Sequence, residues 1–324
     1  MITIEKKIQG EIMSTNVYMS ISSDSHSENE IVKDIEEIIL TLKDFEQRYS
    51  RFKNDSELGL FNSSSGDIKV SDDFKEMLDL SVKYYELTGG VFDISILESL
   101  KKEGYILSIK DGFHKLVEQE KNPQAATQTQ AEPFAHSSLT NIRISPNNST
   151  VFKPKNITVD LGGIGKGYIL GKIANKLVSK YQNFCIDLGG DMYCAGKDVE
   201  KNYEYWAIEI ENPFPDDFET PLTILNNSAI ATSGINKRKW EFKGEEKTHL
   251  IDPNTGKSIK GNILTSTAIS NDAVASDIYA KTCLILGEEK GMGFANKNNL
   301  AVIFITKDKK IIFSNEASKY VWQS

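Results

Sequence analysis

The sequence predicts an α+β fold, because segments of helical and of strand character are interspersed irregularly along the 324 residues. Amphipathic helices are predicted in the first hundred residues, and short β-branched runs alternate with a further helical stripe beyond them. The regular βαβ rhythm of a doubly wound sheet is missing. With 39% hydrophobic residues, the chain has enough apolar side chains for a sizeable core.

Two helices are predicted in the first hundred residues. Over residues 31–49, apolar side chains recur at helical spacing with charged residues between them. A second helix should follow Ser71, because serine is a good N-cap and the two aspartates after it suit the positive end of the helix dipole. That helix should end near residue 88.

The middle and the end of the chain differ from this helical part. Residues 113–140 are polar with no periodicity of either kind, which predicts a mobile loop. Beyond them, alternating or β-branched runs predict strands. These runs are NIRIS (141–145), NITVDL (156–161), FCIDLGG (184–190), YWAIEIENP (205–213) and LAVIFITKDKKIIFSN (300–315), the last as two strands around a turn.

Composition excludes several classes of protein. A formal net charge of −8 argues against nucleic-acid binding, which usually requires a basic face. No stretch approaches the ~18 apolar residues of a membrane span, and the first 21 residues lack the apolar core of a signal peptide. We therefore expect a cytoplasmic chain without a membrane span. Cys185, Cys194 and Cys283 are too few for a disulfide framework and should be core residues.

Residues 160–171, DLGGIGKGYILG, hold five glycines, one carboxylate and one lysine. Because a strand is predicted before them and a helical stripe follows, the glycines should form a strand-to-helix turn. Free N–H groups at a helix start favour an anion. The Rossmann pattern fails at Tyr168 and the Walker A pattern fails at Asp160. Two interpretations stay open, a phosphate site and a purely structural turn.

Seven stretches in this order, together with Met13-Ser14-Thr15, resemble the ApbE family of FAD:protein FMN transferases. The stretches are RFKNDSELGLFN (51–62), TGGVFDIS (88–95), DLGGIGKGY (160–168), DLGGDMYCAG (187–196), AIATSG (229–234), THLIDPNTGKSI (248–259) and NDAVASDIYAKTCLILG (271–287). The resemblance covers nearly the whole chain outside residues 113–140. It implies one large domain, residues 1–324, of mixed sheets and helices with an FAD cleft between two halves.

The resemblance also implies an activity. Transferases of the family move FMN from FAD onto a threonine or serine hydroxyl of an acceptor flavoprotein and release AMP, so FAD and that acceptor are the expected partners. Many family members are exported lipoproteins. Two alternatives stay open: hydrolysis of FAD to FMN and AMP, with water replacing the hydroxyl, and FAD binding with little turnover.

The family pattern places FAD contacts on eight positions. An aromatic ring at Phe52 can stack on a ligand ring, and Lys166, expected in the turn just before the helix, can offer a cation to phosphate. Alternatively, Phe52 and Ile251 are core residues. Asp93 and Asp160 could likewise cap turns. The eight implied positions are Met13, Phe52, Val91, Phe92, Asp93, Asp160, Lys166 and Ile251.

The resemblance implies a general base at His249, since an unperturbed imidazole titrates near pH ~6.5 and can accept a hydroxyl proton at neutral pH. Asp277 is the implied catalytic carboxylate and, with the Gly163 carbonyl, a ligand of Mg²⁺. The third family ligand is a threonine four residues after the aspartate, and here that position is Lys281. Either Mg²⁺ is still bound by the two retained groups, with Lys281 extending to solvent, or the lysine supplies the positive charge. The retained groups favour the first interpretation.

Overall fold

The computed structural model describes residues 1–106 and 138–322, and they divide into two compact units. Unit 1 comprises residues 1–47, 162–236 and those from 261 onward, and unit 2 comprises residues 48–161 and 237–260. Within the described residues there are seven α-helices and five sheets. The predicted α+β class is confirmed.

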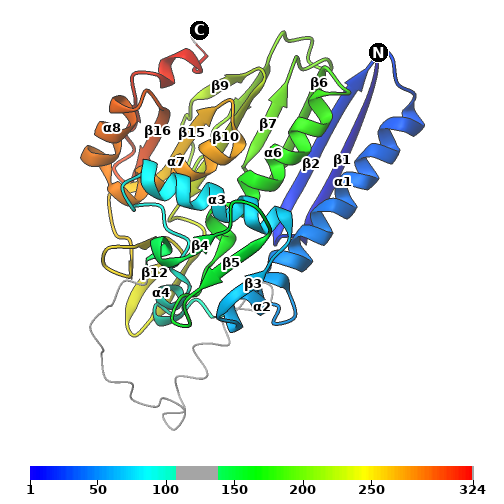
Figure 1. Cartoon of the computed structure of the whole chain (residues 1–324). Helices are drawn as coiled ribbons and strands as arrows, with labels where there is room; N and C mark the ends of the chain where they lie inside the picture. Colours follow the sequence, from blue (N-terminus) through cyan, green and yellow to red (C-terminus); the bar gives the residue numbers. More distant parts are fainter. Residues whose placement is uncertain (107–137, 323–324) are drawn as a thin grey trace. The chain divides into compact units, whose positions relative to one another are not determined.

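Unit 1 is built on an eight-stranded antiparallel sheet with the strand order β1-β2-β6-β7-β10-β15-β16-β17 (Figure 1). The β1–β2 hairpin turns at Met13 and Ser14, whose φ angles of 51° and 56° give the primed turn geometry of two-residue hairpins. The strands are β1 (Ile2–Ile12), β2 (Thr15–Ser23), β6 (Asn183–Leu188), β7 (Met192–Ala195), β10 (Ser228–Gly234), β15 (Ile263–Ser270), β16 (Ala301–Thr306) and β17 (Ile311–Phe313).

Four helices pack in unit 1: α1 (Glu28–Tyr49), α6 (Gly165–Val178), α7 (Ala273–Leu286) and α8 (Glu288–Lys297). Helix α7 contacts β10, β15, α6 and α8, and most of its residues are buried. A further apolar cluster packs Cys185 and Cys194 against Trp206 and Leu225 of the small sheet formed by β8 (Trp206–Glu209) and β9 (Leu222–Leu225). All three cysteines are buried, as predicted. A 3-10 turn, η5 (Ala317–Lys319), lies near the C-terminus.

In its described residues, unit 2 combines three helices with a three-stranded sheet of order β3-β5-β4 and two small hairpins. Helix α3 begins where the sequence predicts, because the Ser71 hydroxyl accepts a hydrogen bond from Phe74 N. The elements are α2 (Glu57–Ser63), β3 (Gly66–Lys69), α3 (Asp72–Leu87), α4 (Leu97–Lys102), η3 (Leu139–Asn141), β4 (Arg143–Ile144), β5 (Thr150–Lys153), β11 (Lys239–Phe242), β12 (Glu245–Thr248), β13 (Ile251–Asp252) and β14 (Lys257–Ser258).

The strands predicted at 184–190, 205–213 and 300–315 are confirmed as β6, β8 and the pair β16–β17, and β4 lies within 141–145. The strand predicted over 156–161 is wrong. There the Asn62 side chain accepts from Val159 N at 2.8 Å and donates to Val159 O at 2.9 Å. Asp160 N donates to Ile94 O. These bonds give the backbone N–H and C=O groups of Val159 and the N–H group of Asp160 partners without a neighbouring strand. The chain then continues into the 3-10 turn η4 (Leu161–Gly163).

The polar segment predicted as a mobile loop, residues 113–140, falls mostly outside the described residues. Its last three residues are described. Ser138 is the N-cap of η3 and the other two residues belong to η3, where Leu139 is fully buried. The end of the predicted loop is therefore packed structure, because one leucine anchors it in an apolar environment.

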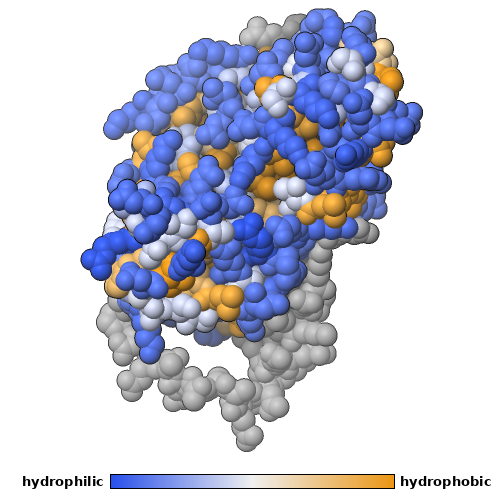
Figure 2. Space-filling view, turned by 45° about the vertical axis from the view of Figure 1, so that its right-hand side comes forward, coloured by the Kyte–Doolittle hydropathy of each residue, from blue (hydrophilic) through white to orange (hydrophobic). Residues whose placement is uncertain are grey.

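The surface reflects the high content of charged residues. Figure 2 shows a face covered mainly by hydrophilic residues, with hydrophobic ones in small groups. Exposed apolar side chains include Leu40 and Leu60, and single cases of this kind are normal on protein surfaces. No helix in residues 1–106 or 138–322 has the length and apolar character needed to cross a bilayer.

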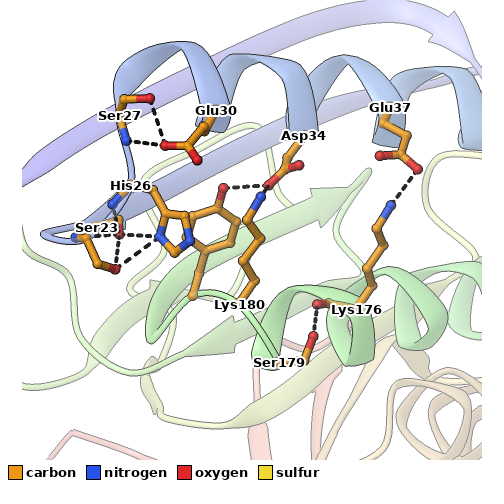
Figure 3. A network of polar contacts seen from close by, with 11 residues as sticks. Ser23, His26, Ser27, Glu30, Asp34, Glu37, Lys176, Ser179 and Lys180 are labelled. Atoms are coloured by element: carbon orange, nitrogen blue, oxygen red, sulfur yellow. Dashed lines mark hydrogen bonds and ion pairs between the residues drawn. The ribbon is translucent and has the colours of Figure 1, made fainter.

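Helix α1 begins three residues earlier than predicted, because the Glu30 side chain caps its start (Figure 3). The Glu30 carboxylate accepts from both the backbone N and the hydroxyl of Ser27 at 2.8 Å. One turn later, Asp34 accepts from Lys180 Nζ at 2.6 Å and from the Tyr181 hydroxyl at 2.5 Å. Lys180 and Tyr181 follow the end of α6, so these bonds tie α1 to that end.

Burial raises the pKa of Asp34, but the hydrogen bonds from Lys180 and Tyr181 outweigh burial and lower it below 3.8 overall. The folded state therefore favours the carboxylate, and this stabilisation is present above the unfolded pKa and is lost as the pH falls through the folded pKa.

We predict that Asp34→Asn lowers the free energy of unfolding by about 0.5–1 kcal/mol at pH 7 and that this difference shrinks as the pH falls below about 4. Urea unfolding at pH 7, 5 and 3 measures it. Glu37→Gln is the matched control, because the Glu37 carboxylate that pairs with Lys176 is 57% exposed. A penalty for Asp34→Asn that stays constant with pH would contradict the assignment.

Candidate functional site

The start of α6 lies directly against α7 at Gly167, in unit 1. A Cβ atom at this position would lie 2.7 Å from Ala273 O and 2.9 Å from the Asp277 Cβ. Glycine is therefore required for the close approach. As a result, Gly167 N donates to Asp277 Oδ2 at 3.2 Å, and a buried carboxylate lies at the N-terminus of α6. Unpaired N–H groups and the helix dipole both stabilise negative charge there.

The other oxygen of this carboxylate, Asp277 Oδ1, accepts from the Lys281 ammonium one turn later on α7. The same ammonium contacts the Asp277 carbonyl oxygen at 3.3 Å. Only 13% of the Lys281 side chain is exposed. The expectation that Lys281 extends to solvent is therefore wrong, because the buried carboxylate one turn earlier holds the ammonium.

Lys166 lies in the first turn of α6 rather than in the turn before it, which corrects the expectation. Its ammonium pairs with Asp191, whose side chain is 3% exposed. Asp191 stands two residues after Gly189, and Gly189 packs so tightly on the Thr15 hydroxyl that no Cβ fits. The hairpin tip carrying Met13 therefore lies beside the turn that carries Asp191.

The two ion pairs interact with each other. Burial raises the pKa of Asp191, the Lys166 ammonium opposes this, the Asp277 carboxylate raises the pKa further and the Lys281 ammonium lowers it. We call Lys166, Asp191, Asp277 and Lys281 the four-charge cluster. Its formal charges sum to zero.

The family resemblance implies Mg²⁺ at Asp277 and Gly163, and the residues present test that implication. Both Asp277 oxygens are engaged, one by a backbone N–H and one by Lys281. An ammonium in contact with the ligand repels a cation, and a lysine side chain offers no oxygen ligand. In the described part of the chain, no three His, Cys, Asp or Glu side chains gather as a metal site would need. The donor set does not fit a divalent cation.

Unit 2 contains a stacked group of aromatic rings around Arg51. The Arg51 guanidinium lies 4.4 Å from the ring centre of Phe52 and 4.2 Å from that of Tyr105, and Tyr105 stacks on Trp240 at 5.2 Å. Arg51 Nε pairs with Asp160 at 2.9 Å. Phe52 is 39% exposed, so its ring is accessible, unlike that of a core residue.

The other predicted positions of unit 2 differ in their environment. Asp160 N donates to Ile94 O at 2.7 Å, which brings Asp160 beside the 91–93 segment. Asp93 Oδ1 accepts from the backbone N and the hydroxyl of Ser95, each at 2.7 Å, so this aspartate caps a turn. Phe92 and Ile251 are buried, with 5% and 1% exposure, whereas Val91 is partly exposed.

His249 lies between β12 and β13 and is partly exposed. Thr248 N donates to the Ser258 hydroxyl at 3.2 Å, and that hydroxyl donates to Thr248 O at 2.8 Å. On the other side, Ile259 N donates to Leu250 O at 2.9 Å. The backbone is thus fixed on both sides of His249, which restricts where its imidazole can lie.

The sequence model of the ApbE family matches residues 13–304. The chain belongs to the ApbE family. A protein of Haemophilus influenzae named FAD:protein FMN transferase is 28% identical over 322 residues, which is 97% of this chain and 90% of the relative. One of Escherichia coli K12 with the same name is 26% identical over 272 residues, 81% of this chain and 74% of the relative.

Solved ApbE structures share the fold of this family member. The ApbE protein of Thermotoga maritima superposes with a TM-score of 0.81 at 21% identity and covers 99% of this chain and 100% of its own. The flavin transferase ApbE of Vibrio cholerae gives a TM-score of 0.77 at 22% identity, with 98% and 100% covered.

Two residues that form ion pairs with predicted site residues of this ApbE chain were not predicted from the sequence. Asp191 stands in a quoted glycine-rich motif, but no spacing rule connects it to Lys166, 25 residues earlier. Arg51 precedes Phe52 directly, and its contact with Asp160 spans more than a hundred residues. Pairings of this range follow from the tertiary fold.

We predict that Gly167→Ala lowers the free energy of unfolding by about 1–3 kcal/mol, because the added methyl collides with the backbone of α7. Gly171→Ala in the same helix is the matched control: its Cβ would lie 3.8 Å from the Ala273 Cβ, an ordinary contact, and alanine favours helix. Chemical denaturation of both variants measures the effect. Equal stability of the two variants would contradict the close approach at Gly167.

Proposed function

We propose that this chain is an FAD:protein FMN transferase, which moves FMN from FAD to a threonine or serine hydroxyl of an acceptor flavoprotein. The observation that carries the proposal is its similarity, over almost the whole chain, to relatives bearing that name. The accessible Phe52 ring and the Lys166 ammonium at the start of α6 give further support.

In the proposed reaction, the acceptor hydroxyl oxygen forms a bond to the phosphorus of the FMN half of FAD. The bond between this phosphorus and the oxygen shared with AMP breaks, AMP keeps the electron pair, and the hydroxyl proton passes to a base. The enzyme must hold the hydroxyl in line, accept its proton and offset negative charge on the phosphate oxygens.

We assign these tasks to individual residues. His249 accepts the hydroxyl proton, because a neutral imidazole is a base near pH 7. Lys166 and the first N–H groups of α6 bind the pyrophosphate. Asp277 holds Lys281 and contacts the start of α6. The proposed FAD contacts are Met13, Phe52, Val91, Phe92, Asp93, Asp160, Lys166 and Ile251. No step is assigned to a metal, because the donor set at Asp277 does not fit one.

Incubation of the chain with FAD and threonine-containing peptides tests the proposal. A flavin-labelled peptide together with free AMP supports transfer. Free FMN and AMP with unlabelled peptide would instead identify an FAD hydrolase. Bound FAD without turnover would identify a flavin-binding protein, and either result contradicts the transferase assignment.

We predict that FAD binds at least about tenfold more tightly than FMN, a difference of about 1.4 kcal/mol. The reason is that the proposed contacts serve both a ring system and a pyrophosphate, and FMN lacks the AMP half. Fluorescence titration with each flavin measures the ratio. Equal affinities would mean that the AMP half is not recognised.

We predict that His249→Ala lowers the rate of FMN transfer by ~10²–10⁴ while the affinity for FAD changes little, because a general base acts mainly in the transition state. Single-turnover rates and FAD titration separate the two effects. His26→Ala is the control, since His26 belongs to the polar contacts near the start of α1. An unchanged rate for His249→Ala would remove this histidine from the mechanism.

A further inference from the structure

We infer that Lys281 takes the place of a divalent cation in this chain, so that an ammonium held on Asp277 supplies the positive charge at this point of the site. The catalytic meaning of this inference rests on the proposed function. The absence of divalent-cation binding is a property of the chain itself and can be measured without FAD.

The spacing of residues on α7 places Lys281 beside Asp277. Asp277 and Lys281 stand four residues apart on α7, with the acidic residue first, which is the favourable order for a helical ion pair. Both side chains are largely buried, the carboxylate at 2% and the lysine at 13% exposure. A cation that replaced the ammonium at Asp277 Oδ1 would have to displace the Lys281 side chain from this buried pair, which costs free energy.

The net charge at Asp277 depends on whether a divalent ion or an ammonium pairs with it. A divalent ion on Asp277 would leave a net charge of +1 at that carboxylate, whereas Lys281 leaves zero. An ammonium has three N–H donors, and the two contacts described for Lys281 both go to Asp277, so a third remains for a phosphate oxygen. This ammonium supplies a fixed hydrogen-bond donor rather than a Lewis acid.

Removal of the ammonium should restore a cation site. In Lys281→Thr the buried Asp277 carboxylate loses its partner, and the new hydroxyl lies one turn along α7 on the same face. A divalent ion then finds a carboxylate and a hydroxyl oxygen, the ligand types that hard cations prefer. Lys281→Met removes the charge but adds no oxygen, and separates the two effects.

The first experiment measures Mn²⁺ binding to FAD-free protein by electron paramagnetic resonance. We expect no specific binding to the unaltered chain. Lys281→Thr should bind Mn²⁺ at least tenfold more tightly than any nonspecific binding of the unaltered chain, and Lys281→Met should bind it more weakly than Lys281→Thr. Lys297→Thr, which removes an exposed lysine at the end of α8, is the control and should behave like the unaltered chain. Specific Mn²⁺ binding to the unaltered chain that Asp277→Asn abolishes would overturn the inference, and this result requires no folded Lys281 variant.

The second experiment measures FMN transfer after thorough chelation. The unaltered chain should keep its activity in EDTA, whereas Lys281→Thr should become dependent on added Mg²⁺. Loss of activity of the unaltered chain in EDTA, restored by Mg²⁺, would overturn the inference. A chain that turns over no FAD under any condition would refute the proposed function alone, and the Mn²⁺ titration would still decide between the ammonium and a metal.

Discussion

The contact between α6 and α7 at Gly167 is the constraint on which the candidate site of unit 1 depends. Because this residue has no side chain, the backbone of α7 reaches the first turn of α6, and Asp277 lies where the unpaired N–H groups of that turn need an acceptor. A carboxylate is held at a helix N-terminus by a neighbouring helix instead of by an N-cap side chain. The N-cap residue itself, Ile164, offers no side-chain hydrogen bond.

This arrangement explains why two lysine side chains lie among buried groups. Asp191 and Asp277 are both nearly inaccessible to water, and an isolated buried carboxylate costs several kcal/mol. Lys166 and Lys281 each neutralise one of them, and the Asp277–Lys281 pair also acts on Asp191. Two ammonium groups thus lie close to the start of α6, where a pyrophosphate is proposed to bind. Each is paired with an aspartate before substrate binds.

Local features of the chain were predictable where short-range physics decides them. The helix after Ser71, the strand pair β16–β17 and the motifs shared with the ApbE family could all be recognised from neighbouring residues. The failed prediction at 156–161 has the opposite cause. Its β-branched residues fit a strand, but the Asn62 side chain provides the hydrogen bonds that a neighbouring strand would make, and Asn62 stands almost a hundred residues earlier.

The sequence by itself determined the α+β class and the presence of a lysine four residues after Asp277, because periodicity and spacing are properties of neighbouring residues. The family could be recognised from the resemblance of its short motifs. The sequence left open whether Lys281 extends to solvent or binds the carboxylate. Only the tertiary structure decided this, since the burial of Asp277 depends on how closely α6 and α7 approach. A buried carboxylate must find partners, and the backbone of α6 and the ammonium of Lys281 are the partners that the fold supplies.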